Sequence, residues 1–219
     1  MAAPIRQLEV KQRNLTVLLA EVTGVDLARR TIEASSPGVG VRKVPFDYLV
    51  VATGMRPSYF GHDEFARYAP SLKNLSDAET IRAKILGAFE LAATTEDERE
   101  RARQMTFVLV GAGPTGVELA ASLAHMVKAS IILLDGAKRI LPTFSEAVSR
   151  RVARRLEKLG VRVVTDVKVE TVDDKGVTAG GNRIPSATVL WTAGVAARRF
   201  PRCWVPVPTA WGGRSLTRS

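Results

Sequence analysis

Cysteine is nearly absent from this chain of 219 residues, in which Cys203 stands alone. An intrachain disulfide and a paired-cysteine redox motif are therefore both excluded, and any redox chemistry has to come from a bound cofactor. Long apolar runs are missing too, because no window reaches the roughly 18 uninterrupted apolar residues of a membrane span. The first twelve residues lack the apolar segment of a signal peptide, so we expect a cytoplasmic protein.

Acidic residues are scarce toward the end of the chain, where the last 45 residues contain neither Asp nor Glu. With 32 Lys and Arg against 22 Asp and Glu, the formal net charge is +10, which permits binding to nucleic acid or to an anionic membrane. Much of the excess lies on one expected helix, residues 145–159, and no aromatic residues alternate with the basic ones as in single-strand binding proteins. We therefore interpret the charge as a solvated helix face and expect no nucleic-acid partner.

Apolar residues are plentiful at 46%, which is typical of a globular domain with a substantial core. The length allows one domain, or one domain and part of a second. In the first half we predict strands at 15–22 and 30–34, separated by a turn at 24–26, and a buried strand at 48–52 that ends in Thr53 and Gly54. We find no internal repeat.

A helix is predicted to begin near Ser76, because a hydroxyl cap there is followed three residues later by the carboxylate of Glu79. The apolar residues that follow recur at spacings of four, four and three, which gives a helix one apolar face. These residues are Ile81, Ile85, Phe89 and Ala92. The charged stretch 96–103 is expected to be a solvated helix end or a linker, and residues 58–76 read as irregular.

From Phe107 onward the pattern changes to strands that alternate with helices. This alternation predicts an α/β fold with a parallel sheet and right-handed crossovers. The expected strands are 107–110, 131–134, 161–164, 167–172, 176–178 and 188–191, and the expected helices are 114–127 and 145–159.

The most informative segment is Gly111 to Gly116, which has the spacing G-x-G-x-x-G. The motif is weak by itself, but here it follows a buried strand and opens a helix, and the next strand ends in Asp135, 19 residues after Gly116. This strand–helix–strand context is the dinucleotide-binding, or Rossmann, pattern. A glycine-rich turn that binds nothing is the alternative, and it fits the complete pattern less well.

Each residue type in the loop has a physical role. Gly111 allows the tight turn, Gly113 lets a diphosphate approach the backbone, and Gly116 lets the helix pack closely on the strand. Pro114 suits the first helical position, where no N–H is needed. The N–H groups of the first turn, which includes Thr115, and the positive end of the helix dipole would hold the diphosphate.

Asp135 is expected to select the cofactor. A carboxylate at this point accepts hydrogen bonds from the adenosine ribose and repels a 2′-phosphate, so NAD(H) is favoured over NADP(H). The cationic Lys138 and Arg139 nearby weaken the argument slightly. Glu118 is expected in the first helical turn, where it either stabilises the helix dipole or faces the nicotinamide, and spacing alone leaves both interpretations open.

Several segments together resemble the type II NADH dehydrogenases, which are single-subunit NADH:quinone oxidoreductases that contain FAD. The AETIR helix joined to the GPTGVE loop is the most specific of these features. The matching segments are PFDYLVVATG (45–54), LKNLSDAETIRAKILGAFELA (72–92), TFVLVGAGPTGVELA (106–120), ILLDGAKRILP (132–142) and VLWTAGV (189–195).

The resemblance implies a partial FAD-binding domain with its linking helix at 1–105, and an NADH domain at 106–195 whose β-meander crossover includes 173–185. In such a protein NADH would reduce FAD, and FAD would pass electrons to a quinone. Glu118 would lie beside the nicotinamide and the flavin as a catalytic residue. The strand ends close to the flavin would be Thr53, Gly54, Thr192, Ala193 and Gly194.

The chain also departs from the family pattern. It holds one glycine-rich loop where the family has two, and it lacks the family's later flavin-contacting Gly-Asp motif. Residues 196–219 do not resemble the family, so we expect an aberrant or disordered tail and a fragment. The alternatives are therefore an NAD(H)-binding module without turnover, or a flavoprotein reductase with another acceptor. We expect no metal, a peripheral membrane association at most, on the inner face of the plasma membrane, and leave a homodimer open.

Overall fold

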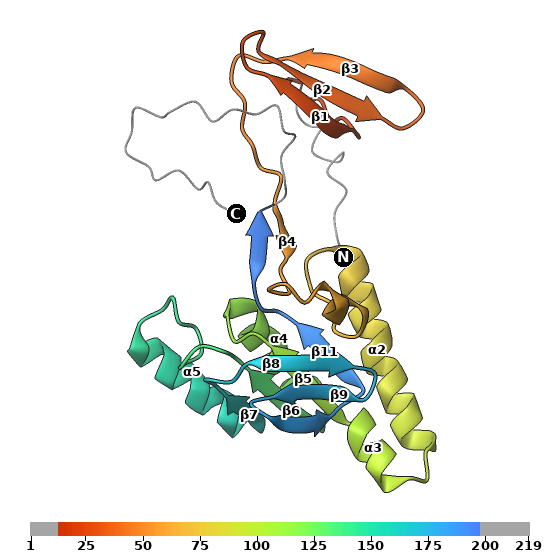
Figure 1. The fold of residues 1–219 in the computed structure, drawn as a ribbon, viewed down its shortest axis with the longest axis vertical. Coiled ribbons are helices and arrows are strands. Elements are labelled where there is room, and N and C mark those ends of the chain that lie inside the picture. The colour runs from red at the N-terminus through yellow and green to blue at the C-terminus, as the bar shows by residue number, and fades with distance from the viewer. Residues whose placement is uncertain (1–12, 198–219) are drawn as a thin grey trace. The chain divides into compact units, whose positions relative to one another are not determined.

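The computed structural model of the protein describes residues 13–197, which belong to two compact units. The first unit reaches to Gly54, and the second runs from Met55 to Ala197. Figure 1 shows the elements of both units. Within residues 13–197, none of the helices combines the length and the apolar character that crossing a bilayer requires.

The first unit contains a three-stranded antiparallel sheet. Its strands are β1 (Glu21–Asp26), β2 (Thr31–Ser36) and β3 (Gly40–Pro45), in that order across the sheet. The prediction of a strand at 15–22 is wrong, because β1 begins at Glu21 and includes the expected turn at 24–26. A β-bulge beside Gly24 keeps this glycine within the strand. The turn comes after Asp26, whose carboxylate accepts the N–H of Arg29 at 2.9 Å.

The predicted buried strand at 48–52 does not form. Its residues pair with no strand in the described part of the chain, and Tyr48 is 94% exposed. An apolar run becomes a buried strand only where strands on both sides supply hydrogen bonds and layers cover both faces. Periodicity reports the apolar run but not whether these partners exist.

The second unit is built on a parallel sheet of four strands in the order β11-β5-β6-β7. The strands are β5 (Thr106–Val110), β6 (Ser130–Leu134), β7 (Val161–Val164) and β11 (Thr188–Trp191). Helices α4 (Pro114–Met126) and α5 (Glu146–Lys158) connect the first three. The predicted α/β class and parallel sheet are confirmed, and all four strands end at the same edge.

Two further helices precede this sheet, α2 (Leu75–Thr94) and α3 (Glu98–Gln104). The predicted cap at Ser76 is wrong by two residues, because Asn74 and Asp77 cap α2 reciprocally. The amide N–H of Asp77 donates to Asn74 Oδ1 at 2.9 Å, and the N–H of Asn74 donates to the Asp77 carboxylate at 3.2 Å. The stretch expected as a helix end or linker is α3, which Asp97 caps.

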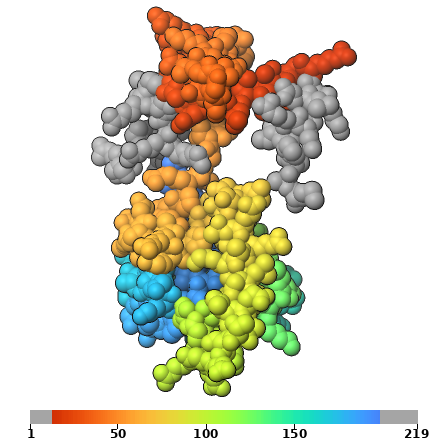
Figure 2. All heavy atoms as spheres, turned by 90° about the vertical axis from the view of Figure 1, so that its right-hand side faces the viewer, coloured from red at the N-terminus to blue at the C-terminus, as the bar shows by residue number. Residues whose placement is uncertain are grey.

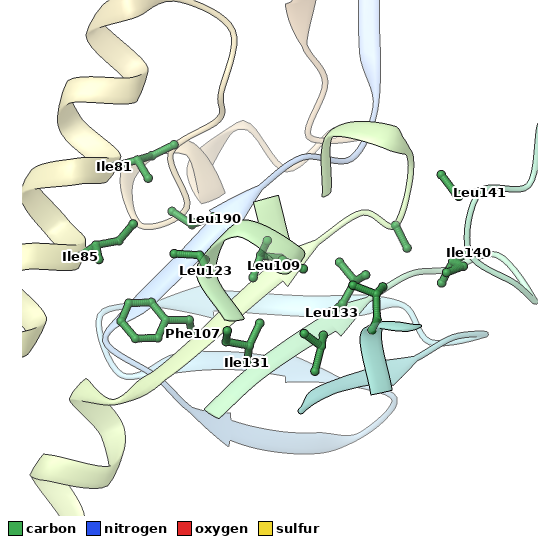
Figure 3. Close-up of a cluster of buried hydrophobic side chains, with 14 of the residues drawn as sticks. Ile81, Ile85, Phe107, Leu109, Leu123, Ile131, Leu133, Ile140, Leu141 and Leu190 are labelled. Atoms are coloured by element: carbon green, nitrogen blue, oxygen red, sulfur yellow. The ribbon is translucent and has the colours of Figure 1, made fainter. Parts of the chain in front are cut away.

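One face of the parallel sheet packs against the helices. Alternate residues of each strand point to this face, and Figure 3 shows how they meet side chains of α2 and α4. Figure 2 shows α2 and α3, in yellow to green, on the outer surface of the unit. The buried residues of this core include Ile81, Ile85, Phe107, Leu109, Leu123, Ile131, Leu133, Leu156 and Leu190.

The opposite face packs against a second sheet, which is antiparallel and forms the connection from β7 to β11. Its strands are β8 (Val169–Asp173), β9 (Gly176–Ala179) and β10 (Asn182–Pro185), so the predicted β-meander crossover is present. The strand β10 was not predicted, because it has one apolar residue besides Pro185 and no alternation. The core between the two sheets includes Val108, Val110, Ile132, Leu134, Val172, Val177, Val189 and Trp191.

The segment before α2 adds a short 3₁₀ helix, η1 (Asp63–Arg67), and the strand β4 (Met55–Pro57). β4 pairs antiparallel with β12 (Val195–Ala197). Pro57 is the last residue of β4, which is an edge strand and therefore tolerates proline. The first two residues of the predicted aberrant tail therefore belong to β12, and the rest of that prediction lies outside the described residues.

Candidate functional site

A cavity of about 760 Å³ lies at the edge of the parallel sheet where its strands end. The residues that line it include the last residues of β5, β6 and β11 and the loops that follow them. β11 lies on one side of β5 and β6 lies on the other, so the direction of strand addition reverses at β5. In open α/β sheets, ligands bind in the crevice at this point of reversal.

The three motif glycines differ in what a side chain would meet. A Cβ added to Gly113 would meet no atom within 4 Å, so this position leaves open space in front of α4. A Cβ on Gly111, whose φ is +107°, would collide with Ala193. A Cβ on Gly116 would overlap Gly111 O and lie 2.6 Å from Thr192 Oγ1. Two glycines therefore allow close packing of the loop, and Gly113 gives access to the backbone.

Helix α4 begins directly behind this space. Gly113 is its N-cap residue and forms no side-chain cap, and Pro114 occupies the first turn, as expected. The first N–H groups of a helix have no partner within the helix, and they carry the positive end of its dipole. The arrangement suits an anionic group such as a diphosphate.

Asp135 follows β6 and lines the cavity. Its carboxylate accepts the N–H of Ala112 at 2.5 Å and the N–H of Ala137 at 2.7 Å. These hydrogen bonds fix the carboxylate against the glycine loop, a role that the sequence did not reveal. Each carboxylate oxygen can accept more than one hydrogen bond, so capacity for a ligand hydroxyl remains.

Arg139 does not compete with Asp135 for the choice of nucleotide. Its guanidinium donates to the carbonyl oxygens of Leu141, Pro142 and Phe144 at 3.2, 2.8 and 2.9 Å, and to Ser149 Oγ. These bonds hold the loop that leads into α5. Lys138, rather than Arg139, is therefore the nearby cation that weakens the prediction of NAD(H) over NADP(H).

The segment that follows β11 forms the side of the cavity beyond the glycine loop. Thr192, Ala193 and Gly194 all line it. The hydroxyl of Thr192 lies 2.9 Å from Val110 O and 2.8 Å from Gly111 O, so it can donate to either carbonyl. This contact joins the ends of β11 and β5 and supports the glycine loop from behind.

Other predicted site residues lie elsewhere. Glu118 is exposed and is the fifth residue of α4, so its expected place in the first turn is wrong. The helix dipole acts mainly within the first turn, which leaves the stabilising interpretation of Glu118 weak. Thr115 lies in the first turn of α4 without lining the cavity. Thr53 and Gly54 belong to the first unit, and their contact with a flavin stays a prediction.

The aromatic wall of the cavity was not predicted from the sequence, and it consists of Tyr59, Phe60, His62, Phe65 and Trp191. The Tyr59 and Trp191 ring centroids are 4.9 Å apart, and the Trp191 indole N–H donates to Ser58 O at 2.9 Å. His62 stacks on Phe65 with 4.8 Å between centroids. Burial raises the pKa of Tyr59, whose hydroxyl donates to Ala69 O at 2.9 Å. Four of these residues come from the segment 58–76, which has no periodicity, and Trp191 ends β11.

A parallel sheet with this strand order, a glycine loop before an uncapped helix and an acid after the second strand define a dinucleotide-binding Rossmann domain. The family model for pyridine nucleotide-disulphide oxidoreductases matches residues 2–208. The chain belongs to this family. The match extends past Val195, so the expectation that the family likeness ends there is wrong.

The chain is similar to the type II NADH:quinone oxidoreductase Ndh of Mycobacterium tuberculosis, with 41% identity over 92% of this chain and 48% of that protein. An external alternative NAD(P)H-ubiquinone oxidoreductase of Arabidopsis thaliana is 30% identical over 89% of this chain and 38% of its own length. The structure of NDH2 from Plasmodium falciparum in complex with NADH has a TM-score of 0.73 and 26% identity over 83% of this chain and 41% of that chain. The predicted resemblance to type II NADH dehydrogenases is confirmed, and the chain spans less than half the length of these relatives.

Proposed function

We propose that the cavity of the second unit binds NADH. The observation that carries this proposal is the open space at Gly113, directly in front of the uncapped start of α4. Asp135 fixes a carboxylate at the end of the neighbouring strand, where the adenosine ribose of a bound dinucleotide would lie. Gly111, Pro114, Thr115 and Gly116 would shape and supply the phosphate-binding turn.

The family and the relatives support a wider function, which is the oxidation of NADH by FAD with a quinone as the final acceptor. FAD would supply the ring that accepts the hydride. The residues of this chain would hold the nicotinamide in place, with Glu118 near the reacting ring and Thr192, Ala193 and Gly194 behind it. Thr53 and Gly54 would contact the flavin. A peripheral position on the inner membrane face and a homodimer belong to the same proposal.

One observation favours a second candidate, an NADH-binding module that does not turn over by itself. Every residue that lines the cavity lies between Tyr59 and Gly194, and so within the second unit. Binding of NADH therefore needs no residue of the first unit, whereas hydride transfer needs a bound flavin. A flavoprotein reductase with an acceptor other than quinone remains a third candidate.

A visible spectrum of the purified chain distinguishes the candidates, because bound flavin absorbs near roughly 450 nm. A yellow protein that oxidises NADH with a soluble quinone supports the enzyme. A colourless protein that changes NADH fluorescence on binding supports the module.

The site itself is tested by Gly113→Val, which places a side chain in the path of the diphosphate and should abolish NADH binding. Gly87→Val is the matched control, because Gly87 also has open space around it and lies on α2 outside the cavity. If Gly113→Val binds NADH with the parent's affinity, the assigned site is wrong.

A further inference from the structure

We propose that Phe60 forms the stacking surface for the nicotinamide ring at the β11 side of the cavity, an inference that rests on the proposed binding of NADH. Phe60 lines the cavity and is 68% exposed, although it is one of the largest apolar residues in the unit. Exposing so much apolar surface is unfavourable unless something covers it. A flat ring of the ligand would do so.

The backbone holds Phe60 in an unfavourable conformation. Its φ is +54°, a left-handed value that bulky residues rarely adopt, and Gly61 follows with φ +93°. Such conformations persist only where the surrounding structure determines them, and they occur preferentially at functional sites. Here the neighbours of Phe60 supply the constraint, because Ser58 Oγ accepts the N–H of Phe60 at 3.3 Å and Ser58 O accepts the indole N–H of Trp191 at 2.9 Å.

The Phe60 ring packs against the segment that follows β11. A Cβ added to Gly194 would lie only 2.6 Å from Phe60 Cζ, so the glycine makes room for the ring. The centroids of Phe60 and Trp191 are 6.5 Å apart, with the rings tilted by 54°. One side of the ring is thereby supported by Gly194 and Trp191, and the ring borders the cavity.

The order of the strands places Phe60 on the nicotinamide side. Asp135 follows β6 and Gly113 lies in the loop after β5, whereas Gly194 follows β11 on the other side of β5. Neighbouring strands are about 4.8 Å apart, so β6 and β11 are separated by about 10 Å. With the adenosine ribose at Asp135 and the diphosphate at Gly113, the remaining half of the dinucleotide extends toward Gly194 and Phe60.

The test compares two ligands, NADH and ADP-ribose, which share the adenosine and the diphosphate but differ in the nicotinamide ring. Loss of an aromatic stacking contact corresponds to a change on the order of fivefold in affinity. We expect Phe60→Gly to weaken NADH binding by about that factor and to leave ADP-ribose binding within about twofold of the parent. Phe60→Trp, which restores a flat ring, should retain the preference for NADH.

Phe60→Gly also controls for folding. Glycine adopts a left-handed conformation without strain, which offsets part of the packing lost with the ring, so the melting temperature of this variant should stay close to that of the parent. Phe144→Ala removes another exposed phenylalanine, one that does not line the cavity, and should change neither affinity.

The outcomes separate this proposal from the one on which it rests. If Phe60→Gly weakens both ligands equally, or neither, while the parent binds both, the stacking role of Phe60 is wrong and the dinucleotide site stands. If the parent protein binds neither ligand, the dinucleotide site itself is refuted, and the Phe60 proposal with it.

Discussion

Replacement of Gly116 by alanine tests the packing of the glycine loop apart from any ligand. Gly116 is buried in the first turn of α4, and a Cβ there would overlap Gly111 O and lie 2.6 Å from Thr192 Oγ1. The loop, the helix or the threonine has to move. Overpacking of this kind costs about 1–3 kcal/mol. Displacing the Thr192 hydroxyl from Val110 O and Gly111 O adds about 1 kcal/mol.

Alanine favours helix over glycine by about 1 kcal/mol, which offsets part of this cost. A net loss of about 2 kcal/mol corresponds to a melting temperature lower by about 5–8 °C in a unit of this size. Thermal unfolding followed by circular dichroism measures the shift. Gly87→Ala is the control, because Gly87 lies in the exposed interior of α2 with free space around it, and the exchange should raise the melting temperature. A Gly116→Ala protein as stable as its parent would show that the loop is not closely packed.

Two further predictions concern charged residues of the second unit. The pKa of Glu100 is lowered from 4.5 to about 2 by hydrogen bonds from Arg103 and then Gln104. Because the folded-state pKa is depressed, its contribution is present above about pH 4.5 and is lost as the pH falls toward 2. Glu100→Gln should therefore lower stability by less than about 1 kcal/mol at pH 7, since solvent screens this partly exposed pair, and the difference in denaturant midpoint should vanish near pH 2. Asp135→Ala should weaken NADH binding at least about tenfold and raise the affinity for NADPH relative to NADH, measured by fluorescence titration. An unchanged NADPH-to-NADH ratio would contradict the role of Asp135.

The parallel sheet and the glycine loop were predictable because their signals are local. The strands β5 and β6 are short, mostly apolar runs, and both faces of the sheet are covered, so their burial agrees with their composition. The spacing of the glycines reveals the loop, although the contacts that require two of them, with Ala193 at Gly111 and Thr192 at Gly116, come from residues that are distant in the sequence. The end of α5 is also determined locally, because Gly160, whose φ is +83°, follows the helix directly after its C-cap residue.

The features that were not predicted depend on residues that are distant in the sequence. The run at 48–52 is apolar like most of β6 but remains largely exposed, because no strand in the described residues pairs with it. The aromatic wall at Tyr59 to Phe65 has no period, and its order comes from contacts with Trp191 more than 120 residues later. The hydrogen bond between Asp135 and the loop likewise cannot be predicted from the motif, because the motif specifies the acidic residue but not its partners.

Every residue that lines the cavity lies in the second unit, so binding of the dinucleotide and transfer of the hydride can be considered separately. The residues proposed to fix the adenosine, the diphosphate and the nicotinamide all come from Tyr59 to Gly194, so we expect the affinity for the dinucleotide to be a property of this unit. The hydride acceptor would be a separate group, and the two cores of this unit consist of its own residues. Binding and turnover can therefore fail independently. A variant that loses turnover while its affinity for ADP-ribose is intact has lost the acceptor or its alignment with the nicotinamide, whereas a folded variant that loses both has lost the dinucleotide site, such as the glycine loop or Asp135.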